Sequence, residues 1–336
     1  MKFVYEVFRR SKLSRNTNEC CKRPFTFSLF LGSYSSSGWS NRLGTVLTPV
    51  STNVYTADRP FLWNSIDVGC RMTVIYLPST NELFVHSPVM IDDRLKAILP
   101  TLGGGTAAAE VRHIVSPNYE HVKFAKYWNQ QYPDANMWAC PGLSSREAST
   151  NWTGEITEGI RPWRFETSTA TPNLPSGFWD VKEIQPLHLN FEVNPFTGRP
   201  FFNEVIFYHT PSKTLLVTDF FWNYPRPDGI PNSIYQSVIK PGQDGVDDQD
   251  YGEWELAPRT DVSWKSLMWK LGMDQIFRPF YLNFMISGDE KREEYKKVVN
   301  FILTEWDIET LIPAHGDVVR GKSLIRQILQ SHLAAV

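Results

Sequence analysis

Two side chains suited to acid–base chemistry or metal binding lie at or just beyond the ends of short segments of apolar or β-branched residues. Asp219 comes after the run Leu215–Thr218, and His315 comes shortly after Thr310–Ile312. A charged side chain is costly inside a sheet, but at the rim of a sheet it can serve a binding or catalytic site. Asp219 could equally be a helix N-cap or a water-exposed loop residue. The pattern therefore marks two candidates and leaves both interpretations of Asp219 open.

Two pairs of short apolar runs predict β-hairpins that would position such residues. The first pair is Met72–Leu77 and Leu83–His86, separated by a turn. The second pair lies within Glu204–Asp219 and is divided by the turn-type tripeptide Pro211–Lys213. Runs rich in β-branched and aromatic residues are typical of strands that pack against a covered face. Asp219 is thus expected at the end of the second hairpin.

Strands and helices alternate around these hairpins. Apolar residues at helical or strand spacing predict strands at 111–116, 136–140 and 310–312, and helices at 91–99, 122–132, 261–271, 290–306 and 323–334. From residue 75 to residue 140 the order is strand, strand, helix, strand, helix, strand. This alternation is typical of an α/β layered fold.

The composition argues against several classes of protein. The 336 residues carry a net charge of −2 and contain no basic, aromatic-interleaved strip, so nucleic acid is not expected as a partner. No run of roughly 18 apolar residues is present, so no membrane span is expected. The four cysteines have no CxxC spacing, which disfavours a zinc ribbon or a disulfide framework and fits a reducing compartment. Cys140 is expected in the core.

The N-terminal segment differs from the rest of the chain. Its first 50 residues hold eight Lys or Arg but only two acids, and Ser33–Ser40 is rich in serine. This is the composition of an organellar transit peptide, which would place the protein in a plastid or another organelle. A disordered basic tail is the alternative, and the protein would then be cytoplasmic. We expect one folded domain from 52 to 336, with a flexible insertion at 225–254.

Four blocks of the sequence resemble the family called domain of unknown function 4336, which is assigned to the metallo-β-lactamase superfamily. They are MTVIYLPSTNELFVHSPV (72–89), HIVSPNYEHVKFAKYW (113–128), EVIFYHTPSKTLLVTD (204–219) and WDIETLIPAHG (306–316). The resemblance implies a four-layer αββα sandwich of metallo-β-lactamase type, with two facing sheets and helices outside. It also implies that Asp219 matches a metal-bridging Asp of the superfamily and that His315 matches a late His ligand.

The chain departs from the superfamily where most metal ligands would lie. At the place of the HxHxDH motif, Pro117, Tyr119 and Val122 stand where the superfamily has three histidines, and His121 stands where it has Asp. The next histidine of the pattern falls near Pro200. Because a dinuclear site needs several imidazoles as well as a carboxylate, the standard dinuclear hydrolase site is not expected.

A reduced site remains conceivable at the same rim. The resemblance brings Asn118, His121, Asp219 and His315 together there, and these groups could hold one divalent ion such as zinc, iron or manganese. They could also form a metal-free acid–base pair, in which Asp219 orients His315 or His121. A hydrogen-bonded remnant that ties loops together is the third interpretation. We expect a loose arrangement, with the His121 donor roughly 5–8 Å from the other two groups, because an imidazole is longer than the Asp side chain that it replaces.

Two functions follow from this ligand set. The first is a catalytically silent protein that binds a small molecule or a protein partner in the remnant cleft. The second is a divergent hydrolase in which His121, Asp219 and His315 are the catalytic residues, working with one metal or as a His/Asp pair. The loss of most ligands favours the first function, while the retention of Asp219 and His315 favours the second. His113 and His209 are expected to be structural residues of strands. His86 ends a strand near the same rim and could join the group, but a core position is favoured.

Overall fold

The computed structural model describes residues 46–59, 61–63, 66–103, 107–156, 176–224, 268–269, 271–286 and 288–334. Most of the basic N-terminal extension, the insertion expected at 225–254 and most of the helix expected at 261–271 lie outside these residues. Within the described part of the chain, none of the helices has the length and apolar character needed to cross a bilayer.

The first sheet has seven strands and contains the first hairpin. Their order is β1 (Thr48–Ser51), β2 (Val54–Arg59), β5 (Cys70–Leu77), β6 (Glu82–His86), β7 (Glu110–Ser116), β8 (Asn136–Ala139) and β9 (Gly154–Glu155). The β5–β6 pair confirms the hairpin expected at 72–86, and the strands from β6 to β9 are parallel to one another. Pairing begins at Thr48, four residues before the boundary expected at 52. A separate two-stranded sheet consists of β3 (Leu62–Trp63) and β4 (Ile66–Asp67).

The second sheet has five strands and contains the second hairpin. Their order is β10 (Ile184–His188), β11 (Val205–His209), β12 (Thr214–Val217), β13 (Thr310–Pro313) and β14 (Val319–Arg320). Strands β11 and β12 form the expected antiparallel pair. Strand β13, which is almost 100 residues later in the chain, pairs with β12 in parallel. The carboxyl ends of β12 and β13 therefore lie together at one edge of the sheet.

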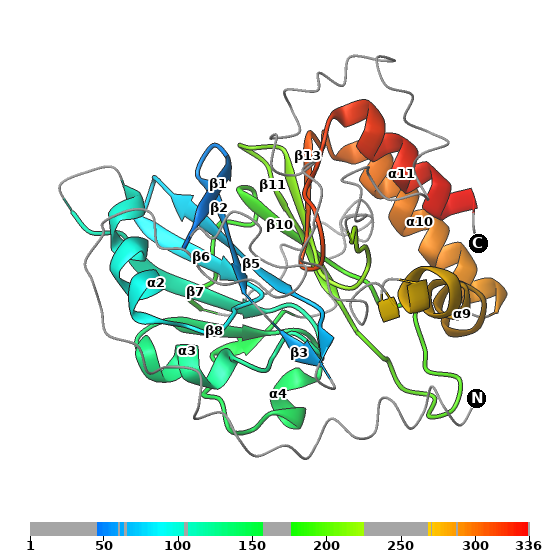
Figure 1. Ribbon diagram of the computed structural model, residues 1–336, viewed down its shortest axis with the longest axis horizontal. Coiled ribbons are helices and arrows are strands. Elements are labelled where there is room, and N and C mark those ends of the chain that lie inside the picture. The colour runs from blue at the N-terminus through cyan, green and yellow to red at the C-terminus, as the bar shows by residue number, and fades with distance from the viewer. Residues whose placement is uncertain are drawn as a thin grey trace.

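The two sheets face each other and carry helices on their outer faces (Figure 1). The first sheet is covered by α2 (Asp93–Ile98), η2 (Leu99–Gly103) and α3 (Ala125–Gln131), and the second by α10 (Asp289–Glu305) and α11 (Lys322–Ala334). The remaining helical segments are α4 (Leu143–Arg146), η3 (Met273–Phe277), α9 (Arg278–Phe280) and η4 (Tyr281–Met285). This arrangement confirms the four-layer αββα sandwich.

Side chains along a single strand point alternately to the central core and to the helices outside the sheet. In β6, Phe84 packs into the core between the sheets, while Leu83 and Val85 pack beneath the helices of the first sheet. In β11, Phe207 faces the same central core, and its ring lies 5.6 Å from that of Phe84. Its neighbours in sequence, exemplified by Ile206, face α10 and α11. Because successive strand side chains point to opposite faces, strands buried on both sides are mostly apolar.

Candidate functional site

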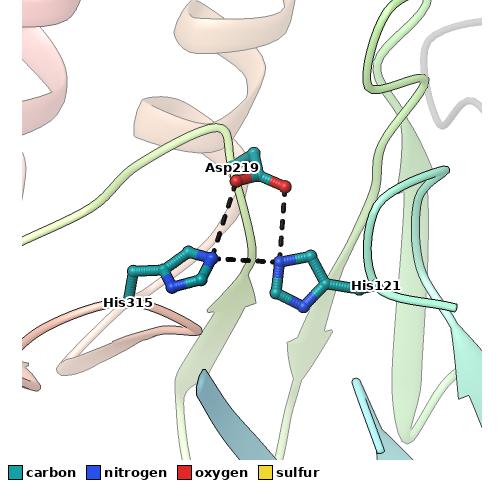
Figure 2. A group of neighbouring side chains, drawn as sticks. All are labelled: His121, Asp219 and His315. Carbon is teal, nitrogen blue, oxygen red and sulfur yellow. Dashed lines mark hydrogen bonds and ion pairs between the residues drawn. The ribbon is translucent and has the colours of Figure 1, made fainter. Parts of the chain in front are cut away.

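Three loops at one end of the sandwich carry the candidate residues. Asp219 lies two residues beyond Val217, the last residue of β12, and His315 lies two residues beyond Pro313, the last residue of β13. Val217 and Pro313 are register partners in the parallel pair, so the two loops start side by side. His121 comes from the loop after β7, in the facing sheet. The fold thus brings together side chains that are 194 positions apart in the sequence (Figure 2).

The three side chains form a compact group (Figure 2). His121 Nε2 lies 3.3 Å from Asp219 Oδ2 and 3.2 Å from His315 Nε2, and His315 Nε2 lies 3.7 Å from Asp219 Oδ1. One potential ligand atom from each residue fits within 4.8 Å of the others. The loose arrangement expected for His121 is therefore wrong. The side chains are only 6% exposed for His121 and 11% for the other two residues, so water has limited access.

Asn118 explains why His121 reaches the group. Its Oδ1 accepts hydrogen bonds from the backbone N–H of Glu120 and His121, at 3.0 and 2.8 Å, which folds the loop after β7 into a tight turn. Its Nδ2 donates to Asp219 Oδ2 at 2.6 Å and to Thr218 Oγ1 at 2.9 Å. In this arrangement Asn118 orients Asp219 and keeps its own oxygen on the backbone rather than directing it to the group.

His315 presents the lone pair of one ring nitrogen to the group. Its Nδ1 lies 2.8 Å from the carbonyl oxygen of Gly69, which can only accept a hydrogen bond, so Nδ1 carries the hydrogen and donates it. Nε2 is then unprotonated in the neutral ring and faces Asp219 and His121. Burial and the nearby His121 ring lower the pKa of His315 to about 4, so the neutral form predominates near pH 7.

The loop that carries His315 is fixed on both sides. Arg71, in the first sheet, donates from its guanidinium to the carbonyl oxygen of Gly316 at 2.6 Å and from its backbone N–H to that of Ala314 at 2.8 Å. On the other side, the N–H of Asn223 donates to the carbonyl oxygen of His315 at 3.0 Å. Gly316 has a φ of +90°, and a Cβ there would lie 2.1 Å from the Asn223 backbone. Only glycine permits this approach.

His121 and Asp219 form a buried ion pair in the absence of a metal ion. Burial opposes protonation of His121, but the charge of Asp219 and the hydrogen bond to it raise the His121 pKa well above its ordinary value. Burial opposes ionisation of Asp219, but the His121 charge lowers the pKa of this carboxyl. On the other side of the ring, His121 Nδ1 lies 2.7 Å from Ser87 Oγ and 3.8 Å from Cys70 Sγ.

Glu204 is a buried residue of the site that sequence reasoning missed. Its carboxylate accepts three consecutive backbone N–H groups, those of Thr218, Asp219 and Phe220, at 2.6, 2.8 and 2.7 Å. Burial and the charge of Asp219 raise the pKa of Glu204 to about 7. The signal in the sequence was an acid directly before β11, a strand that is buried along its whole length, because a buried carboxylate must find hydrogen-bond donors.

A small aromatic cavity opens onto the group. Its volume is about 90 Å³, and Phe61, Phe124, Phe202, Trp222 and Phe277 are among the residues of its wall, together with all three members of the group. Lys123 and Glu120 also border it. The cavity thus combines polar groups at one end with apolar walls, which is the usual composition of a small-molecule site.

His86, His113 and His209 lie outside the group, and the core position favoured for them is confirmed. His86, His113 and His209 are all buried. The His86 ring packs against Phe207, at 5.4 Å between ring centroids, and burial together with the His121 charge lowers its pKa to about 3. His113 Nδ1 accepts from Trp138 Nε1 at 3.2 Å, and His209 Nδ1 lies 2.6 Å from Ser212 Oγ. Cys140 is also buried in the core, as expected.

Comparisons with known proteins found one family and a number of solved structures. The profile of a family described as "Domain of unknown function (DUF4336)" matches residues 51–240. No curated protein matched. Similar solved structures include VMB-1 (12% identity, TM-score 0.47, covering 86% of this chain and 96% of that one), the metal-soaked Flv1 flavodiiron core from Synechocystis sp. PCC6803 (12%, 0.47, 86% and 60%) and a metallo-β-lactamase from Hirschia baltica (9%, 0.44, 86% and 96%).

Proposed function

The chain belongs to the family described as Domain of unknown function (DUF4336), and we propose that it is a hydrolase-like protein that binds one divalent metal ion through His121, Asp219 and His315. The observation that carries the proposal is the spacing of the three donor groups, with the closest donor atoms 3.2, 3.3 and 3.7 Å apart. No fourth His, Cys, Asp or Glu joins the group among the residues that the structure describes. This ligand set fits one ion.

The donor spacing suits a tetrahedral ion. Metal–ligand bonds of about 2.0–2.2 Å at tetrahedral angles place donor atoms roughly 3.3–3.6 Å apart. The separations from His121 Nε2, of 3.2 and 3.3 Å, lie close to this range, and Asp219 offers a different oxygen to each imidazole. Two imidazoles and a carboxylate are suitable ligands for zinc, iron or manganese. With one ligand atom from each residue, the three atoms lie within 4.8 Å of one another, so the pair that is farthest apart must come closer to bind a tetrahedral ion.

The surrounding hydrogen bonds are those expected around metal ligands. A ligating histidine usually donates its second ring N–H to a carbonyl or carboxylate, and a ligating carboxylate is itself held by donors. His315 donates to Gly69, and Asp219 accepts from Asn118. Binding of the ion requires His121 to release its Nε2 proton, so binding is coupled to proton release.

Three protein ligands leave one position open, which is the pattern of catalytic rather than structural zinc sites. An ion held there would polarise a substrate oxygen and make a bound water more acidic. The chain itself contributes orientation and exclusion of water. Asn118 and Glu204 hold Asp219 in place, and the aromatic walls limit access of solvent to the polar end of the cavity. These contributions favour hydrolysis of a small substrate.

A metal-free binding protein is the second candidate. The observation that favours it is the His121–Asp219 ion pair, which satisfies both buried groups without any ion. In this case the pair is a remnant that stabilises the loops, and the cavity binds a small molecule or part of a protein partner. The two candidates differ in whether the purified protein retains a metal.

Elemental analysis separates the two candidates. The protein is incubated with zinc, iron(II) or manganese(II), dialysed, and assayed for metal per chain. The proposal predicts about one ion per chain, lost in Asp219→Ala and kept in Asp93→Ala, whose carboxylate is 77% exposed on α2. Less than one tenth of an ion per chain with every metal would refute the hydrolase-like function and leave the binding protein.

A further inference from the structure

Lys123 is the one lysine or arginine on the wall of the cavity in the described part of the chain. Its Nζ lies 4.4 Å from the centroid of the Phe61 ring and 5.5 Å from that of Phe124. No carboxylate of the described residues forms a salt bridge with this amine. Cation–π contacts with two rings hold a charged side chain in place without neutralising it. A positive charge therefore lies beside the aromatic walls.

The charges around the cavity favour an anion once a divalent ion is bound. Asp219 is engaged by both imidazoles and by Asn118, so it is not available to a ligand. Glu120 is the other acid on the wall, and it is exposed to solvent. With a divalent ion bound, the ion and Lys123 together outweigh the two carboxylates. The cavity then attracts anions and disfavours cations.

The size of the cavity limits the ligand. An apolar cavity of about 150 Å³ accommodates benzene, a molecule of six heavy atoms. By the same proportion, the cavity of about 90 Å³ accommodates roughly four heavy atoms. Rings such as those of Phe202 and Trp222 line the cavity, and they favour an apolar body over a polar one because apolar surface leaves water there.

We propose that the cavity binds a short-chain carboxylate anion, with its carboxylate toward the metal ligands and Lys123 and its apolar tail along the aromatic rings. This inference rests on the proposed single-metal site. It deepens that proposal by naming the ligand class: a small monocarboxylate, as substrate or product, rather than an amine or an uncharged amide. A charge-assisted hydrogen bond from Lys123 supplies the discrimination between the acid and the amide.

The test uses three probes close to this size: propionate and propionamide, with five heavy atoms each, and n-propylammonium, with four. Metal content is first measured on each preparation, and each probe is then titrated by isothermal titration calorimetry, with the fluorescence of Trp222 and the other tryptophans as a second readout. Lys123→Gln removes the charge and keeps a polar side chain that is one bond shorter. Lys126→Gln is the matched control, because Lys126 lies exposed one helical turn later and does not border the cavity.

We expect propionate to bind at least about tenfold more tightly than propionamide, and n-propylammonium not to bind. Lys123→Gln should weaken propionate binding about tenfold with metal content unchanged, and Lys126→Gln should have no effect. Equal binding of acid and amide, or an unaltered affinity in Lys123→Gln, would overturn the ligand class even if one ion per chain is present. Absence of the ion would instead refute the proposed function, so the two failures are distinct.

Discussion

Replacing Glu204 by glutamine should weaken metal binding, although Glu204 is not one of the proposed metal ligands. Two of the three N–H groups that Glu204 accepts, those of Asp219 and Phe220, bond to one oxygen, and that of Thr218 bonds to the other. A glutamine can keep the first two bonds only by pointing its NH₂ group at the Thr218 N–H, which lies 2.6 Å from the present oxygen. Two donors then face each other, and the loop that carries Asp219 must shift.

The size of the effect follows from these bonds. Loss of one hydrogen bond to a charged group costs about 1.5–3 kcal/mol, and part of this is offset because the neutral amide is less costly to bury. Loss of an outer-shell partner typically lowers metal affinity by about 10–100-fold. We therefore expect Glu204→Gln to weaken zinc binding by at least about tenfold, measured by competition with a chromogenic chelator at pH 7.

The matched control is Glu192→Gln. Glu192 is also buried, but its carboxylate accepts from the backbone N–H of Asn203 rather than from the loop that carries Asp219. This variant should change stability and leave zinc affinity within about twofold of the wild type. If Glu204→Gln binds zinc as tightly as the wild type while its thermal unfolding is altered, Glu204 stabilises the fold but does not position Asp219, and the reasoning fails.

Three further predictions concern the site and the borders of the domain. Asn118→Ala should lower zinc affinity about tenfold, since both Asp219 and the turn before His121 lose a partner; an unchanged affinity by chelator competition would contradict this role. Burial raises the pKa of Glu192 from 4.5 to about 8, so the folded protein binds an extra proton across this range and its free energy of unfolding should fall as pH rises from about 5 to 8. Urea titrations should show that the free energy of unfolding falls less with pH in Glu192→Gln than in the wild type. An equal fall in the two proteins would mean that Glu192 does not cause this pH dependence. A chain that starts at Val46 should unfold at the same temperature as the full chain, whereas one that starts at Thr52 lacks β1 and the 3.1 Å contact of Ser51 with Thr214, and should unfold a few degrees lower. If the chain that starts at Val46 unfolds at a much lower temperature than the full chain, the basic extension packs against the domain. That result would contradict the expectation that the extension is a transit peptide.

The two sheets and their covering helices could be predicted from the local spacing of apolar residues. This is possible because the apolar residues of each strand or helix determine which of its faces is buried. Phe84 and Phe207 lie in apolar runs, and Tyr295, Val298 and Ile302 lie at helical spacing on the buried face of α10. The rim positions of Asp219 and His315 also followed from the ends of strands. Pairing of β12 with β13 brought them together, and the family resemblance rather than local pattern implied that contact.

The compactness of the group was not predictable from ligand types alone. The position of the His121 ring depends on the turn that Asn118 makes and on a hydrogen bond from Asn118 to Asp219, 101 positions away. The role of Glu204 likewise depends on three backbone N–H groups that approach only after β11 and β12 have paired. Such side-chain bonds across the fold leave no periodic signal in the sequence.

X-ray absorption at the metal edge of the loaded protein tests the central claim most directly. The account predicts one ion per chain with nitrogen or oxygen ligands at about 2.0–2.2 Å and the outer-shell scattering of two imidazole rings. His315→Ala should remove one ring from this signal, and Asp219→Ala should remove the ion. A bound ion without imidazole scattering, or a signal that is the same in His315→Ala, would show that the ion lies elsewhere and that His121, Asp219 and His315 do not form a metal site.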